Sequence, residues 1–123
     1  MAYINDDILD LALSGIDDDT ENLYICSQEP TTYAEAQTTY KLGTKATPAI
    51  GAPENGASNG RSIIVAAITD GTVDGTGTAT HYALTDNSAS KLLATGALSS
   101  SQAVTSGNTF TLTEFSVTIP DAV

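Results

Sequence analysis

Residues 61–85 read RSIIVAAITDGTVDGTGTATHYALT, and this stretch decides the fold class. Its first nine residues are dominated by an unbroken apolar run, which predicts a strand over residues 61–69 buried on both faces. Asp70-Gly71 is a strong hairpin signal. Two further strands are predicted over residues 72–77 and 78–85, with Gly75 and Gly77 allowing a bend or bulge.

The sequence on either side continues as short apolar segments separated by turn signals. Turns are predicted at Asp86-Asn87-Ser88 and Gly107-Asn108, and a connection at residues 99–101. The predicted strands cover residues 23–27, 40–42, 91–97, 102–105 and 109–119. Turn signals about every ten residues are typical of a β-sandwich or barrel. The predicted fold is therefore all-β: an antiparallel β-sandwich, jelly-roll or Ig-like, with one short N-terminal helix and with a small barrel left open.

The last predicted strand contains a change of phase. Phe110 and Leu112 share one face of an ideal strand, whereas Phe115 and Val117 share the other. An extra residue in the strand would restore a common face. We therefore predict a β-bulge near Thr113-Glu114, with Phe115 not exposed.

The N-terminal part is predicted to be a helical arm. Asn5 is a suitable N-cap for a helix over residues 6–14, in which Ile8, Leu9, Ala12 and Leu13 form the apolar face. Ile4 and Leu9 occupy the positions of a hydrophobic staple. Gly15 is predicted to end the helix in a left-handed conformation, and residues 17–22 to form an exposed acidic loop. The chain is therefore predicted to have two parts. They are a helical arm with its acidic loop over residues 1–22 and a β-sandwich domain over residues 23–123.

Residues 44–60 are predicted to be a long irregular loop, because Gly and Pro interrupt every regular pattern there. A weaker pattern predicts a turn of helix over residues 31–37. Neither the loop nor the N-terminal segment over residues 2–16 is explained by a sandwich core. Both are therefore predicted to contact other proteins.

The charge balance excludes several classes of partner. The chain has four Lys and Arg residues and fifteen Asp and Glu residues, which gives a formal net charge of −11. Such a chain is repelled by nucleic acid and by anionic membranes. Cys26 is the sole cysteine, so no disulfide forms within the chain. No signal peptide or membrane-spanning segment is predicted.

No catalytic, cofactor or metal site is predicted, and the chain is expected not to be an enzyme. The single histidine, His81, is expected to be structural, although a Cys26–His81 thiol–imidazole pair is formally possible. The acidic run over residues 17–21 lacks the ligand spacing of a calcium loop. The glycine-rich run over residues 71–77 has no Lys and leads into no helix, so it does not bind phosphate.

Several segments together resemble a group of small structural proteins of tailed bacteriophages. They are Ile25-Cys26-Ser27-Gln28-Glu29-Pro30-Thr31-Thr32-Tyr33, Gly60-Arg61, Gly77-Thr78-Ala79-Thr80-His81-Tyr82-Ala83-Leu84 with Asp86, Leu92-Leu93 and Gly107-Asn108-Thr109-Phe110. The resemblance implies a virion component made in the host cytoplasm, a decoration (cement) protein on the exterior of the head. It implies the major capsid protein as partner, and a homo-oligomer, with a trimer as one option.

Two alternatives remain. One is a tail- or fibre-associated protein or a carbohydrate-binding β-module that contacts the host. The other is a small hydrolase that uses Cys26 or His81.

Overall fold

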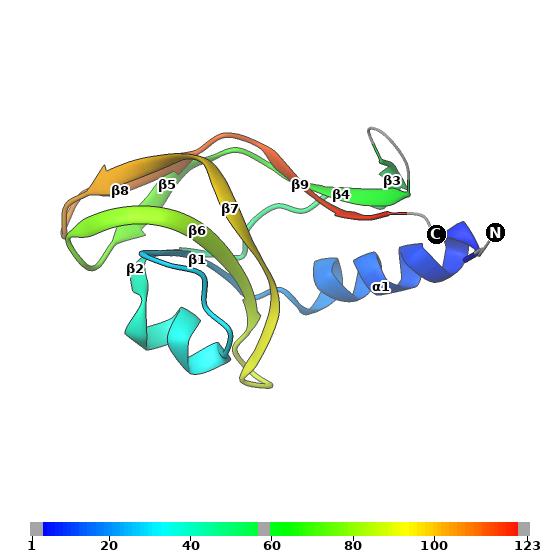
Figure 1. Cartoon of the computed structure of the whole chain (residues 1–123), viewed down its shortest axis with the longest axis horizontal. Coiled ribbons are helices and arrows are strands. Elements are labelled where there is room, and N and C mark those ends of the chain that lie inside the picture. The colour runs from blue at the N-terminus through cyan, green and yellow to red at the C-terminus, as the bar shows by residue number, and fades with distance from the viewer. Residues whose placement is uncertain (1–3, 57–59, 121–123) are drawn as a thin grey trace.

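The computed structural model describes residues 4–56 and 60–120, which form a β-rich body with a projecting arm (Figure 1). Strands make up 51% of these described residues. The elements are α1 (Asp6–Asp19), β1 (Asn22–Cys26), the π-helical turn η1 (Glu35–Thr39), β2 (Lys41–Ala46), β3 (Glu54–Asn55), β4 (Arg61–Val65), β5 (Ile68–Val73), β6 (Gly77–Asp86), β7 (Lys91–Val104), β8 (Thr109–Leu112) and β9 (Phe115–Ile119).

The body is a six-stranded antiparallel sheet in the order β7-β6-β1-β2-β5-β8, which curls on itself. Alternation along the strands points one set of apolar side chains to the inside of the curl. This core includes Leu23, Ile25, Val73, Leu84 and Phe110. A smaller cluster, Tyr24, Cys26, Ala36 and Ala83, fills the space under η1.

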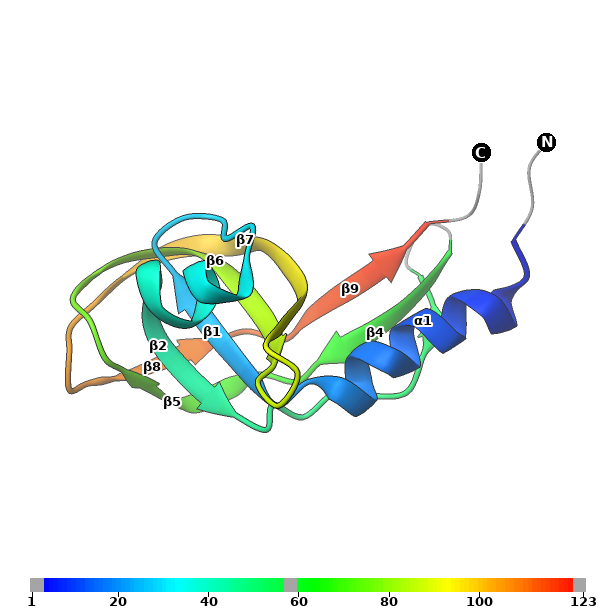
Figure 2. The ribbon, with the colours of Figure 1, turned by 90° about the horizontal axis from the view of Figure 1, so that it is seen from below.

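The arm is a three-stranded sheet, β3-β4-β9, with α1 lying along it (Figure 2). In the β4–β9 pairing, Ile63 lies opposite Val117 and Val65 opposite Phe115, so these side chains share one face. Arg61 lies on that face and binds Asp10 of α1. The helix therefore covers the apolar face of the arm, where its Leu9 and Leu13 are buried.

The structure confirms a mostly antiparallel β-protein with one helix. The strands predicted over residues 23–27 and 78–85 are present as β1 and β6, and the turn between β6 and β7 lies where the sequence placed it. A sandwich is not confirmed, because the six-stranded sheet curls around its own core while the small second sheet projects away from it.

Two strands that were predicted to be continuous are each divided between the two sheets. Residues 61–69 split into β4 and the start of β5, and residues 109–119 split into β8 and β9. Val65 pairs with Phe115 and Ile68 with Leu112, so two unpaired residues on each strand face each other at the break. The predicted irregularity at Thr113-Glu114 is therefore in the right place, but it is a passage from one sheet to the other and not a bulge.

The hairpin predicted at Asp70-Gly71 is wrong, because both residues lie inside β5. A Cβ atom on Gly71 would lie 2.3 Å from the ring of Phe110. The glycine thus lets the Phe110 ring pack against the strand backbone, and it makes no turn. The strand predicted over residues 72–77 is also wrong beyond Val73, since the chain turns there before β6 begins.

The predicted end of the helix is wrong as well. Gly15 does not have a positive φ, and α1 continues to Asp19, taking in part of the predicted acidic loop. The added turn lets Ile16 pack against the body core. Asn5 does cap the helix, accepting a hydrogen bond from the Asp7 backbone N–H at 2.7 Å.

Two loop predictions and one strand prediction also change. The connection predicted at residues 99–101 lies inside β7, which runs from Lys91 to Val104 and bulges opposite Thr80. The predicted strand over residues 40–42 extends to Ala46. The predicted loop over residues 44–60 therefore contains the end of β2 and also the short strand β3, while residues 57–59 lie outside the described residues.

A pair of glycine substitutions tests this packing. Gly71→Ala is expected to lower the free energy of unfolding by about 1–3 kcal/mol, because the added methyl group forces Phe110 out of its place. Gly15→Ala is the matched control: no atom lies within 4 Å of its Cβ position, and alanine in a helix interior is favoured by roughly 0.5–1 kcal/mol. Urea unfolding of both variants measures the difference. Equal effects of the two substitutions would contradict the packing of Phe110 on Gly71.

Candidate functional site

The two segments predicted to contact other proteins meet in the arm. The N-terminal segment supplies α1, and the segment over residues 44–60 supplies β3, an outer strand of the arm's sheet. Residues 2 and 3 lie outside the described residues. Each predicted contact segment therefore contributes to one projecting structure instead of forming a separate loop (Figure 2).

A single arginine fixes these pieces to each other. Arg61 donates from Nε to Asp10 Oδ1 at 2.7 Å and from Nη2 to Oδ2 at 3.0 Å, and from Nη1 to Asn55 Oδ1 at 2.7 Å. These bonds to Asp10 raise the pKa of the Arg61 guanidinium. A bidentate pair fixes orientation as well as distance, so it sets how α1 lies on the sheet. This pair could not be predicted from local sequence patterns, because the partners lie 51 residues apart.

The outward side of α1 carries exposed apolar side chains. Ile4, Ile8 and Leu11 are 43%, 57% and 68% exposed, the largest apolar residues left exposed among those described. Ile8 was predicted to share the buried face, but the helix buries Leu9 and Leu13 instead. Ile8 and Leu11, three residues apart, lie on one side of the helix, and Ile4 directly precedes the Asn5 cap; we call this group the α1 stripe (Ile4, Ile8 and Leu11).

Acidic side chains lie in the first and last turns of the helix that carries this stripe. Asp6 and Asp7 in the first turn of α1 suit the positive end of the helix dipole. The last turn contains Asp17, Asp18 and Asp19 and no basic residue, although cations are favoured there. These three carboxylates destabilise the helix on its own, so helix stability does not account for them.

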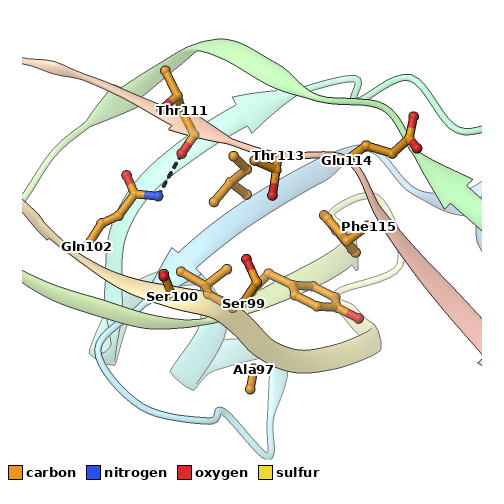
Figure 3. Close-up of a pocket in the computed structure, with 11 residues that line it drawn as sticks. Ala97, Ser99, Ser100, Gln102, Thr111, Thr113, Glu114 and Phe115 are labelled. Carbon is orange, nitrogen blue, oxygen red and sulfur yellow. Dashed lines mark hydrogen bonds between the residues drawn. The ribbon is translucent and has the colours of Figure 1, made fainter.

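A pocket of about 260 Å³ opens where the curled sheet fails to close (Figure 3). β7 and β8 are the outer strands of that sheet, and Gln102 Nε2 bridges them by donating to the Thr111 carbonyl oxygen at 2.7 Å. The walls combine the ring of Phe115 with polar side chains of Ser99, Thr113 and Glu114. We call this site the seam pocket. It could not be predicted, because the bulge in β7 and the break after β8 meet only in the folded chain.

The structure places Cys26 and His81 opposite each other on β1 and β6. The Cys26 thiol is buried and its Sγ lies 3.9 Å from the Ala36 carbonyl oxygen, while burial raises its pKa to about 12. His81 Nδ1 lies 2.9 Å from Thr80 Oγ1, and Nε2 lies 4.0 Å from a Glu29 carboxylate oxygen. A thiol that keeps its proton at neutral pH is a poor nucleophile.

The other sites weighed from the sequence are taken up by secondary structure. The acidic run at residues 17–21 belongs largely to the last turn of α1, and the glycine-rich run at residues 71–77 joins β5 to β6. Within residues 4–56 and 60–120, no group of three or more His, Cys, Asp and Glu side chains is placed to hold a metal ion. No helix of these residues is long and apolar enough to cross a membrane.

Comparison with known proteins finds no matching family model, no similar curated protein and no similar solved structure.

The buried thiol leads to a chemical prediction. With a pKa of about 12, Cys26 is expected to react with a disulfide reagent at pH 8 far more slowly than an ordinary thiol of pKa about 8.5. The absorbance of the released thiolate measures the rate, with the urea-unfolded protein as the fast reference. Rapid labelling of the folded protein that His81→Ala slows would contradict this and would support a thiol–imidazole pair.

Proposed function

We propose that this chain is a non-enzymatic virion structural protein, a decoration (cement) protein that binds the outside of a tailed-phage head. The observation that carries the proposal is the arm: a helix that exposes the α1 stripe is held away from the body. Exposed apolar patches on a soluble protein mark interaction sites, because covering them removes apolar surface from water. The resemblance of several sequence segments to phage structural proteins supplies the class of partner.

The charges around the α1 stripe indicate what kind of surface would be complementary to it. The α1 stripe lies between carboxylates at both ends of the helix, and the sole cation facing α1 from β4, Arg61, is already paired. A complementary surface presents an apolar groove bordered by Lys and Arg. We assign this surface to the major capsid protein. A net charge of −11 disfavours the inner side of the shell, where DNA lies.

The mechanism is linkage between binding and shell stability. A ligand that binds only the assembled shell stabilises it by about 2.7 kcal/mol per site at ~100 times its dissociation constant. Copies that associate with one another multiply the effect, since each further contact becomes intramolecular.

Substitution in the α1 stripe tests the proposal. Leu11→Gln is expected to leave the fold intact, since Leu11 is 68% exposed, and to weaken binding to purified heads by roughly tenfold or more. Ala103→Gln on β7, which is also exposed, is the matched control on the body. Copies per particle are counted on purified heads, and their position is determined by electron cryo-microscopy. Equal occupancy for both variants would remove the arm from the contact, and finding no copies on heads would overturn the assignment.

The seam pocket supports a second candidate, a carbohydrate-binding module. An aromatic ring beside hydroxyl, amide and carboxylate groups is the usual composition of a small-molecule site, with the polar groups fixing orientation. A glycan array with the purified protein tests this candidate. Glycan binding that is lost in Gln102→Ala would support the carbohydrate-binding module, and binding to no glycan on the array would exclude it.

A further inference from the structure

The two outer strands of the arm's sheet differ in how they are protected. β3 has only two residues, one of them Glu54, and follows Pro53; short, charged and Pro-bearing edges resist further pairing. β9 has five residues, Phe-Ser-Val-Thr-Ile, with no charge and no Pro until Pro120. Its outer edge pairs with no strand in the described part of the chain. An edge of this kind is open to another strand.

The sequence of β9 is complementary to itself. If two β9 strands pair antiparallel about Val117, Phe115 of each lies opposite Ile119 of the other, and Ser116 lies opposite Thr118. Apolar residues then meet on one face and hydroxyl residues on the other, the combinations that stabilise cross-strand pairs. The pairing uses every residue of β9, and Pro120 limits it to this length.

The helix extends the same surface. Ile8 and Asp10 lie about 100° to either side of the buried Leu9. Asp10 faces β3, because its partner Arg61 also binds Asn55. Ile8, which is 57% exposed, therefore lies on the opposite flank of α1, the flank turned toward the β9 side of the sheet. The flank of the helix that carries Ile8 thus faces the same side of the arm as the edge of β9.

A two-fold axis perpendicular to the sheet would bring both helices to the same face. The two copies of β4 would then lie three strand spacings apart, about 14 Å. Helices about 10–12 Å wide, one above each β4, would lie side by side with Ile8 and Ala12 between them. This contact would add buried area to that of the strand pairing, and a stable dimer generally buries at least about 1,200 Å² in total.

We propose that β9 is a homodimer edge, which pairs antiparallel with β9 of a second copy about Val117 to give one six-stranded sheet in the order β3-β4-β9-β9-β4-β3. The dimer does not depend on the proposed attachment to phage heads. Of the α1 stripe, the dimer would use Ile8, whereas Leu11, on the side of the helix opposite the buried Leu9 and Leu13, stays available to another partner. Because each copy carries a net charge of −11, salt is expected to strengthen the dimer by screening the repulsion.

Engineered cysteines test the register in the full chain, on a Cys26→Ala background. In the proposed pairing the two copies of Val117 lie directly opposite, about 4.5–5.5 Å apart at Cα, within reach of a disulfide. The two copies of Thr118 are offset by about 7 Å along the strands and about 5 Å across, too far for one. Val117→Cys is therefore expected to give a disulfide-linked dimer under mild oxidation, and Thr118→Cys, the matched control, a monomer. Equal cross-linking of the two variants would overturn the register, and no cross-linking of Val117→Cys would overturn the pairing.

Sedimentation of the protein without engineered cysteines provides a second measurement. A dimer is expected at about 100 µM protein, with more dimer as salt is raised. The double substitution Ser116→Lys, Thr118→Lys places like charges opposite each other and is expected to give a monomer, while Ala89→Lys, with one added charge in a distant turn, leaves the dimer in place. A wild-type monomer or trimer, or a dimer that survives the double substitution, would overturn the proposal. None of these outcomes bears on head binding, which is measured on particles.

Discussion

The structure depends on one two-stranded ribbon that belongs to both sheets. β5 pairs with β8 in the body, β4 pairs with β9 in the arm, and Ala66-Ala67 and Thr113-Glu114 face each other at the break between them. The side chains of both strands change face at this break, so each half can bury its apolar side in its own sheet. Just beyond it, Phe115 packs against Tyr82 of the body with ring centroids 4.2 Å apart. The position and direction of the arm follow from this crossing.

The body is tightly packed, whereas the arm contains exposed apolar and unfavourably placed acidic side chains. In the body, Gly71 and Phe110 pack so closely that a single methyl group does not fit, which is typical of a core selected for stability. In the arm, α1 ends in three carboxylates that its own dipole disfavours, and it leaves Leu11 in solvent. The three carboxylates and the exposed Leu11 lower the stability of the free protein. Their presence is explained if another surface covers them. The arm is therefore the part of the molecule on which both proposals rest.

Two neighbouring sides of the arm are proposed to bind two different partners, and Ile8 lies at the border between these sides. The outward α1 stripe suits a surface with an apolar groove and basic borders, whereas the edge of β9 suits a second copy of the same strand. In a dimer the Leu11 side chains of both copies would lie on one face, since a two-fold axis perpendicular to a sheet keeps both helices on the same side. Two weak contacts to a repetitive surface then act together, which is how a small protein reinforces a large assembly.

Local sequence was sufficient for the class of fold, the N-cap at Asn5, the turn after Asp86 and the position of the irregularity at Thr113-Glu114, because each depends on neighbouring residues. It was misleading at Gly15 and Gly71, where glycine fits a turn equally well in sequence but in the fold continues a helix or makes room for a ring. The Asp10–Arg61 pair, the seam pocket and the exposed edge of β9 were decided by the tertiary structure alone. All three features depend on how segments far apart in the chain are placed in space. A hydrophobic pattern with a period of two or 3.6 residues predicts which way a side chain points, but it does not predict which strand lies next to it.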